Sequence, residues 1–400
     1  MTTMMTMTTT SRRRLLRAAL AVIVVFGSAP APRAQSVSEV LGFLVTNQSV
    51  PTGDFERDRA AAQATSETIS RALVARLATL PITTSSSSFV YRLNPALGTD
   101  ERATTSFDPF FVGRALTAGR HQASIGLTFQ HLSFTALDGR NLLDGSLVTT
   151  ANQFADETEP FDVDRLALNM DASIVTLHGT YGVTDRLEVG FAVPTVTLRL
   201  EGSRVNTYRG QTFTQGRASA VAVGLADIAA RTKYLLYDEE GYQLAAAALL
   251  RLPTGREDDL LGSGSASLRL SAIGSLERPR GSAHLNAGFS VGGIGRELNY
   301  GSAAALAVTP RLTVSGELIG RWLDGGGPIV TSSAPHPRLA GVNTLRLLPG
   351  SAATNLISVV PGMKWNVGDT WVLAANATLP LTGTGLTSPV TPFVGVDYTF

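Results

Sequence analysis

Apolar and polar residues alternate along most of the chain from about residue 120 to its end. Residues 312–322 show this on two faces: Leu312, Val314, Leu318 and Trp322 against Thr313, Ser315, Glu317 and Arg321. A period of two residues is typical of a β-strand with two unlike faces. The pattern predicts twelve strands, near residues 121–134, 172–183, 187–202, 224–237, 242–253, 267–277, 282–292, 299–308, 312–322, 355–367, 370–379 and 392–400.

The connections between these segments alternate in length. Every second one is short, namely 184–186, 238–241, 278–281, 309–311 and 368–369, while the others are longer, with 293–298 the weakest example. Outer-membrane barrels alternate short periplasmic turns with longer external loops, and a soluble sandwich has no reason to do so. The fold class predicted for residues 116–400 is therefore all-β, a transmembrane antiparallel up-and-down β-barrel of about twelve strands.

Periodicity alone does not choose between a membrane barrel and a soluble one, because a soluble barrel has the same alternation turned inside out. No stretch after residue 35 carries 18 consecutive apolar residues, so the sequence predicts no membrane-spanning helix there. Only helices and closed barrels satisfy every backbone group in lipid. The features at the two ends of the chain decide for the membrane barrel.

The first 34 residues have the pattern of a signal peptide. Arginines at positions 12, 13, 14 and 17 precede a short apolar run at residues 18–27, and small residues and prolines follow. The run is too short to cross a bilayer as a helix, which needs roughly 20 residues, although a membrane anchor is the alternative interpretation. We expect cleavage after Ala34 and export to the bacterial outer membrane.

The last residues, "TPFVGVDYTF", place Val396, Tyr398 and Phe400 on one face of a strand. This ending resembles the C-terminal assembly signal of bacterial outer-membrane proteins, which the barrel-assembly machinery recognises. Pairing of this strand with the first one would leave no free edge. The expected partners are therefore outer-membrane lipid, the barrel-assembly machinery and a small-molecule solute.

Residues 35–115 differ from the barrel. One helix is predicted between residues 51 and 81, with Pro81 as its stop signal. Its apolar stripe consists of Phe55, Ala62, Ile69, Leu73 and Leu77. Residues 82–115 show no clear period. We expect a small N-terminal segment that lies in the periplasm or plugs the lumen, and a loosely packed extension is the alternative.

Residues 224–270 carry a more specific pattern. Its residues are Gly224, Asp227, Lys233 and Tyr234, then Leu252, Pro253, Thr254 and Gly255, then Gly262, Ser263 and Gly264. This stretch resembles the outer-membrane family named for the meta-pathway of phenol degradation. The resemblance implies an outer-membrane channel or transporter, and it does not imply phenol as the ligand.

Composition narrows the chemistry. Charged residues make up 16% of the chain and apolar residues 44%, with a net charge of +1, so nothing favours a nucleic-acid partner. The chain has no cysteine, which excludes disulfides and thiolate sites. The histidines lack metal-ligand spacing, residues 256–265 match neither a calcium nor a phosphate loop, and no G-x-S-x-G motif occurs. We expect no cofactor, no metal, no catalytic residue and no enzyme.

Charged residues on the polar faces of the strands are the candidates for the lumen lining. They are Glu188, Asp227, Arg231, Lys233, Arg251, Arg269, Glu277, His284, Glu317, Arg321, Lys364 and Asp397. Five acidic and six basic side chains suggest paired charges across a narrow lumen. As an alternative, Arg231, Lys233, Arg251 and Arg269 would form a basic track that favours anionic solutes such as aromatic carboxylates.

These observations lead to one functional hypothesis and two alternatives. The hypothesis is an outer-membrane channel that passes small solutes, with hydrophobic or aromatic compounds as candidates, by passive diffusion. The first alternative is a structural or adhesive barrel without transport. The second is an outer-membrane lipid hydrolase that would use His131 on the outer wall.

Overall fold

In the computed structural model, the residues described are 35–46, 55–77, 91–94, 99–102, 104, 106–239, 241–324, 327–368 and 370–400. The signal-peptide prediction for residues 1–34 lies outside them. Among the helices of these ranges, none has the length and apolar character needed to cross a membrane.

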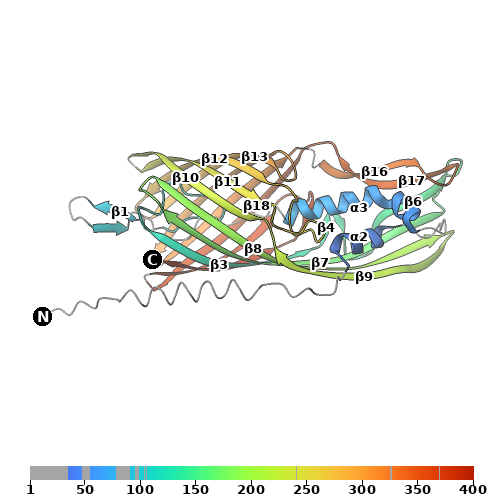
Figure 1. Ribbon diagram of the computed structural model, residues 1–400, viewed down its shortest axis with the longest axis horizontal. Coiled ribbons are helices and arrows are strands. Elements are labelled where there is room, and N and C mark those ends of the chain that lie inside the picture. Colours follow the sequence, from blue (N-terminus) through green and yellow to red (C-terminus); the bar gives the residue numbers. More distant parts are fainter. Residues whose placement is uncertain are drawn as a thin grey trace.

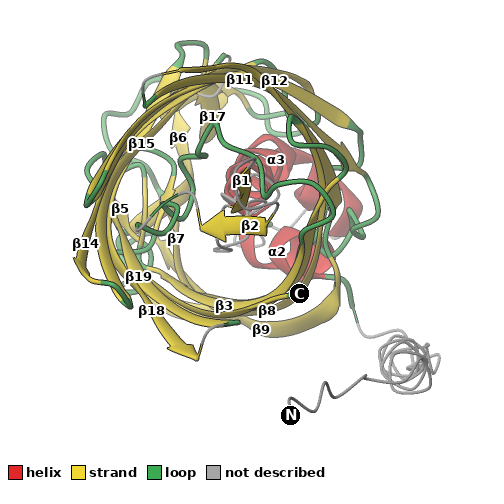
Figure 2. Ribbon diagram, turned by 90° about the vertical axis from the view of Figure 1, so that its left-hand side faces the viewer, coloured by secondary structure: helices red, strands yellow, loops and turns green. Residues whose placement is uncertain are grey.

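Twelve antiparallel strands form one closed ring (Figure 2), which confirms the predicted fold class. Neighbouring strands are hydrogen-bonded all the way round, and the last strand pairs with the first through Val396 and Leu127. The ring strands are β3 (Ala123–Phe134), β7 (Asp162–Gly182), β8 (Leu187–Tyr208), β10 (Ile228–Glu239), β11 (Tyr242–Leu252), β12 (Ser267–Arg278), β13 (Gly281–Gly292), β14 (Glu297–Thr309), β15 (Leu312–Leu323), β18 (Thr354–Gly368), β19 (Trp371–Pro380) and β21 (Thr391–Thr399).

The wall has its apolar face outside. On β3, Leu127 is 47% exposed whereas the next residue, Thr128, is 4% exposed. On β15, Val314 and Leu318 are exposed and Glu317 is buried. A water-soluble barrel would show the reverse, so this polarity is that of a barrel whose outer wall contacts lipid.

The lengths of the connections follow the predicted alternation. The links β7–β8, β10–β11, β12–β13, β14–β15 and β18–β19 contain two to four residues each, and they lie at the same end as the C-terminus. We call this the short-turn end and the opposite one the long-loop end. The β13–β14 link is an exception at the long-loop end, with only residues 293–296.

The long-loop end contains strands where the sequence analysis placed only connections, and β7 and β8 extend beyond their predicted ranges. The additional strands are β4 (Ala136–Leu137), β5 (Arg140–Asn141), β6 (Leu147–Phe154), β9 (Gln211–Leu225), β16 (Gly327–Pro335), β17 (Val342–Gly350) and β20 (Leu386–Thr387). β7 and β8 continue past the ring, where they pair with β6 and β9. Near the ring the inward faces of this extension are apolar, as at Leu168 and Leu198, because they cover a core. Towards the far end they carry buried polar residues, among them Asp162, Asp164 and Arg204.

Two helices fill this extension, α2 (Val37–Val45) and α3 (Phe55–Leu77), so the prediction of a single helix was wrong. Figure 1 shows both at the end opposite the C-terminus. α2 packs against β8 and β9, and α3 against β17 and β6. Ser36 and Glu39 form a capping box at the start of α2. Ile69 and Leu73 of the predicted stripe of α3 are buried in the core.

A short hairpin, β1 (Tyr91–Asn94) with β2 (Thr99–Arg102), lies beyond the ring at the short-turn end (Figure 1). Between this hairpin and β3, the chain runs inside the ring (Figure 2). The described parts of residues 35–115 therefore occupy both ends of the barrel and part of its lumen. The fold thus places a non-barrel segment among the polar side chains of the inner wall.

The closing strand β21 ends in aromatic contacts. The ring of Tyr398 lies 4.8 Å from that of Trp371 and 4.9 Å from that of Phe400, measured between centroids. Inside the same seam, Nε2 of His178 lies 2.9 Å from Oδ1 of Asp397. Gly126 of β3 lies beside this pair, and a side chain there would collide with both partners.

Candidate functional site

Residues 106–118 cross the lumen without helix or strand structure, and we call them the plug segment. An irregular backbone at membrane depth requires hydrogen-bond partners from the protein around it. Here the partners are side chains of the barrel wall. Five of the charged residues predicted for the lumen lining bind this segment directly, namely Glu188, Lys233, Glu277, Glu317 and Lys364.

Glu317 of β15 holds the middle of the plug segment. Its carboxylate accepts hydrogen bonds from the backbone N–H groups of Phe110, Phe111 (2.9 Å) and Val112 (2.8 Å). Lys364 of β18 donates to the carbonyl of Pro109 (3.1 Å), and its ammonium lies 4.6 Å from the centroid of the Phe110 ring. Two oppositely charged wall residues therefore bind opposite polar groups of the same backbone.

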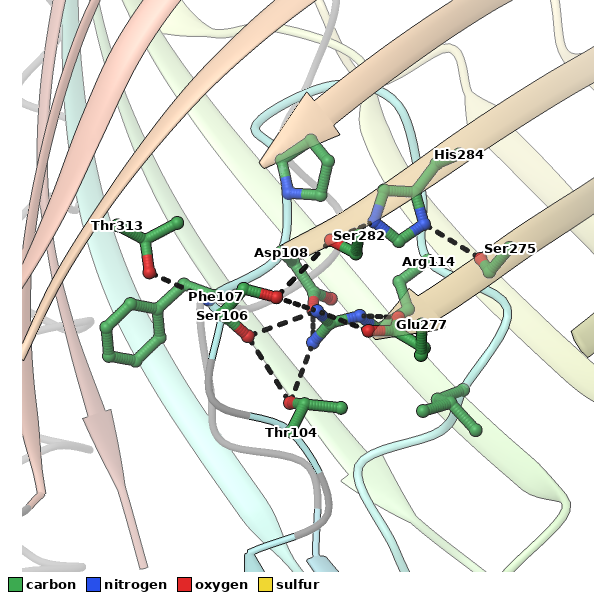
Figure 3. A network of polar contacts seen from close by, with 12 residues as sticks. Thr104, Ser106, Phe107, Asp108, Arg114, Ser275, Glu277, Ser282, His284 and Thr313 are labelled. Carbon is green, nitrogen blue, oxygen red and sulfur yellow. Dashed lines mark hydrogen bonds and ion pairs between the residues drawn. The ribbon is translucent and has the colours of Figure 1, made fainter. Parts of the chain in front are cut away.

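Arg114 of the plug segment is fully buried and bonded to two carboxylates (Figure 3). Its Nη1 lies 2.5 Å from Oδ1 of Asp108, and its Nε lies 2.8 Å from Oε1 of Glu277 on β12. It also donates to the carbonyl of Ser106 at 3.1 Å. Burial alone would raise the pKa of Asp108, but Arg114 and then Lys233 outweigh burial and hold that pKa below its usual range.

Hydroxyl groups complete this part of the site. The side chains of Ser106 and Ser282 lie 3.3 Å apart, and the backbone N–H of Ala115 donates to Ser275 at 2.8 Å. His284 bridges the two wall serines, with Nδ1 at 2.8 Å from Ser275 and Nε2 at 2.9 Å from Ser282 (Figure 3). The histidine thus orients the hydroxyls that contact the plug segment.

Lys233 and Glu188 hold the last part of the plug segment. Lys233 of β10 donates to the carbonyls of Arg114 (3.2 Å) and Leu116 (2.7 Å), and its Nζ lies 3.2 Å from Oε1 of Glu188 on β8. The other oxygen of Glu188 accepts from the N–H of Ala118 at 2.9 Å. Lys233 and Glu188 therefore neutralise each other's charge, and both also form hydrogen bonds with backbone groups of the plug segment.

The other candidates of the predicted lining have different surroundings. Arg269 and Arg321 pair with Glu297, while Asp397 pairs with His178 away from the plug segment. Arg231 lies next to Gly113 of the plug segment, and Arg251 is buried on β11. Of the predicted track of Arg231, Lys233, Arg251 and Arg269, Lys233 is engaged with the plug backbone and Arg269 with Glu297, and a joint role of the four stays a prediction.

Asp227 belongs to the rim at the long-loop end, between β9 and β10, and not to a barrel strand. It accepts hydrogen bonds from the N–H groups of Gly255 (3.2 Å) and Ser263 (2.9 Å) and from the Ser263 hydroxyl (2.7 Å). Thr254 donates to the carbonyl of Ala226 at 2.7 Å. Gly255 and Gly262 approach so closely that a side chain on either would collide with the other. The motif of residues 224–264 therefore closes one rim loop.

Comparison with protein families agrees with this motif. The model of the family described as "Putative MetA-pathway of phenol degradation" matches residues 151–384, more than half of the chain. The chain belongs to this family. None of the curated proteins matches this chain.

Solved structures with some similarity include the COG4313 outer membrane channel from Pseudomonas putida F1, at 14% identity, with 73% of this chain and 99% of that chain covered and a TM-score of 0.46. The toluene transporter TbuX of Ralstonia pickettii has 12% identity, coverage of 81% and 99%, and a TM-score of 0.29. The outer membrane protease OmpT of Escherichia coli has 12% identity, coverage of 72% and 99%, and a TM-score of 0.26. These similarities are too low to argue for a shared solute or activity.

Several charged residues with partners in the lumen were not among the predicted candidates. Asp108 and Arg114 lie in a stretch without periodicity, although "FDPFFVGRA" combines buried-type aromatics with two charges. Glu297 fell in the connection predicted at 293–298, whereas it begins β14. A charged residue embedded among aromatic residues was the available signal for the plug segment.

The lipid-hydrolase alternative depends on the surroundings of His131 on the outer wall. Nδ1 of His131 lies 3.0 Å from the hydroxyl of Ser173, but the hydroxyl of Ser133 donates to Asp171 at 2.5 Å and lies 3.4 Å from His131. A serine nucleophile needs its proton taken by the histidine and nearby donors for an oxyanion. β3 and β7 pair in continuous register here, which uses their backbone donors. Within the described residues, no group of three or more His, Asp or Glu side chains could hold a metal ion.

Proposed function

We propose that the protein is an outer-membrane channel that passes small solutes by passive diffusion, and that the plug segment controls the passage. The barrel is closed, its outer wall is apolar and its inner wall is polar and charged. Short turns face the periplasm in outer-membrane barrels, so the short-turn end faces the periplasm. The helices α2 and α3 then lie at the cell-surface end.

The observation that carries this proposal is the way in which the plug segment is bound. Its polar contacts with the wall are hydrogen bonds and ion pairs of side chains such as Glu317, Lys233 and Glu277. Its apolar side chains also pack against the wall, as Phe110 does against Phe393. Side chains alone fill a barrel of about eight strands, whereas this ring of twelve strands is wider, so the plug segment occupies space that would otherwise be open. A segment that is bound by noncovalent side-chain contacts and takes no part in the strand pairing can leave its place, which opens a path without breaking the barrel.

The solutes that suit this lumen are small. Hydrophobic or aromatic compounds remain candidates, because Phe110 and Phe111 project from the plug segment towards Phe393, with ring centroids at 5.5 and 6.1 Å. The charged wall favours solutes that also carry a polar group. No energy-coupling motif occurs in the sequence, which favours diffusion down a gradient.

Planar-bilayer recording of the complete mature chain tests this proposal. We expect discrete conductance steps, and liposomes that contain the protein should swell in small sugars or amino acids. Hydrolysis of phospholipid by the same preparation is measured in parallel. Folded protein without conductance or swelling would contradict the channel and favour the structural or adhesive barrel, whereas lipid hydrolysis abolished by His131→Ala would favour the enzyme.

A further inference from the structure

A cavity of about 120 Å³ lies in the lumen between the end of α3 and the plug segment. Three arginines line it: Arg76 from the last turn of α3, Arg269 from β12 and Arg321 from β15. Phe111 and Val112 of the plug segment form another part of its wall. We call this cavity the arginine chamber.

Positive charge exceeds negative charge around the arginine chamber. Glu297 pairs with Arg321, at 2.7 Å between Nη2 and Oε2, and with Arg269, at 3.2 Å between Nη2 and Oε1. Among the described residues that line the chamber, none is Asp or Glu. One carboxylate therefore serves two guanidinium groups, and it stands beside the chamber rather than in it.

Arg76 adds a third positive charge to the arginine chamber, and Glu297, the carboxylate beside the chamber, pairs with the other two arginines. Its Nε is buried and has no hydrogen-bond partner within the described part of the chain. Burial and then Arg321 lower the pKa of Arg76 to about 10, so the group stays charged at neutral pH. Guanidinium groups removed from water need an anion with matching hydrogen-bond acceptors. The chamber has the donors for such an anion.

The remaining wall indicates the body of the ligand. Phe111, Val112, Ile319 and Leu356 give the chamber an apolar side. Its volume is of the same order as the roughly 150 Å³ of an apolar cavity that accommodates benzene. A small inorganic anion would leave this side unfilled, and a large amphiphile would not fit.

We propose that the arginine chamber binds a small monocarboxylate whose body is apolar and about the size of one ring. The inference rests on the proposed function, since it assumes that solutes enter this lumen. The carboxylate competes with Glu297 for Arg269 and Arg321 and also pairs with Arg76, while the ring contacts Phe111. Because Glu317 holds the backbone of Phe111 and Val112, exit towards the short-turn end requires movement of the plug segment.

Calorimetric titration of the complete folded protein in detergent with benzoate tests the proposal, with benzamide as the uncharged probe of equal size. We expect saturable benzoate binding, no measurable benzamide binding, and affinity about tenfold or more weaker in Arg76→Gln and in Arg321→Gln. Arg76 lies outside the barrel wall, so its variant leaves strand pairing intact. Arg296→Gln, an exposed neighbour of Glu297, is the matched control and should bind as the wild type does.

The outcomes separate this proposal from the channel itself. If the protein conducts but does not bind benzoate, the proposed binding in the arginine chamber is overturned and the channel proposal is unaffected. The same holds if Arg76→Gln and Arg321→Gln leave benzoate binding unchanged. Equal binding of benzamide and benzoate overturns the role of the arginines. Benzoate binding that depends on the arginines in a protein without conductance supports the chamber and overturns the channel.

Discussion

Removal of the Arg114 charge should release the plug segment. Arg114→Gln leaves Asp108 and Glu277 as two buried carboxylates without their shared cation, since both lie within 2.8 Å of the guanidinium. Breaking a buried ion pair on one side costs about 3–5 kcal/mol. We take the lower end, about 3 kcal/mol, because both acids keep slight exposure in the lumen. The population of the released plug then rises about a hundredfold.

Cysteine labelling measures this population directly, because the natural chain has no cysteine. Ser106→Cys places a thiol at a position that is 2% exposed, so a maleimide reacts with it only after release of the plug segment. We expect labelling about a hundredfold faster when Arg114→Gln is added. Arg120→Gln, an exposed arginine next to the plug segment, is the control and should leave the rate unchanged.

A triple variant shows whether the faster labelling comes from uncompensated charge or from a general loss of packing around position 114. Asp108→Asn, Arg114→Gln and Glu277→Gln together remove all three charges and should label more slowly than Arg114→Gln alone, since no unpaired charge remains. Migration of unheated samples in SDS gels confirms that the barrel is folded. Labelling of the Arg114→Gln variant within twofold of its parent would refute the anchoring role of Arg114.

Three further predictions follow from other contacts. Arg114 holds the pKa of Asp108 below its usual range. The stabilising effect of the Asp108 carboxylate is therefore present above the unfolded pKa of about 3.9 and is lost as pH falls through the lower folded pKa. In single-channel recordings, Asp108→Asn should open more often than wild type from pH 7 down to about 4, and the difference should vanish at lower pH. Asp227→Ala should loosen the rim loop by about 3 kcal/mol, from the loss of three hydrogen bonds to a carboxylate, and trypsin should then cut at the exposed Arg256 much faster than in Asp227→Asn. Deletion of Phe400, which is 70% exposed and packs on Tyr398, should reduce the folded barrel in outer-membrane fractions, whereas Phe213→Ala, at an exposed aromatic of β9, should not.

The sequence predicted the barrel well because alternation is a local property. Each ring strand shows which face meets lipid within its own residues, as Leu127 and Thr128 do on β3. The strands β16 and β17 of the extension were missed because their apolar and polar residues follow no steady period of two, whereas β7 keeps the alternation beyond the range predicted for it. The helix α2 is short and apolar, and only the Ser36–Glu39 capping box marked it as helical.

The plug contacts were beyond local patterns for a different reason. Arg114 and Glu277 are 163 positions apart, and nothing near either residue indicates the other. The sequence could list the charges of the inner wall, but it could not tell that Glu317 binds a backbone while Arg321 binds Glu297. Those roles depend on where an aperiodic segment lies in three dimensions.

The central claim is that solutes pass when the plug segment moves. Ser106 and Ser282, whose hydroxyl oxygens lie 3.3 Å apart, can be replaced by a cysteine pair close enough for a disulfide in a chain with no other thiol. Single-channel conductance of Ser106→Cys/Ser282→Cys should be nearly abolished when the pair is oxidised and should return with reductant, while the conductance of each single variant should be the same in oxidant and in reductant. Equal conductance of the oxidised and reduced protein would contradict the claim that the plug segment controls the channel.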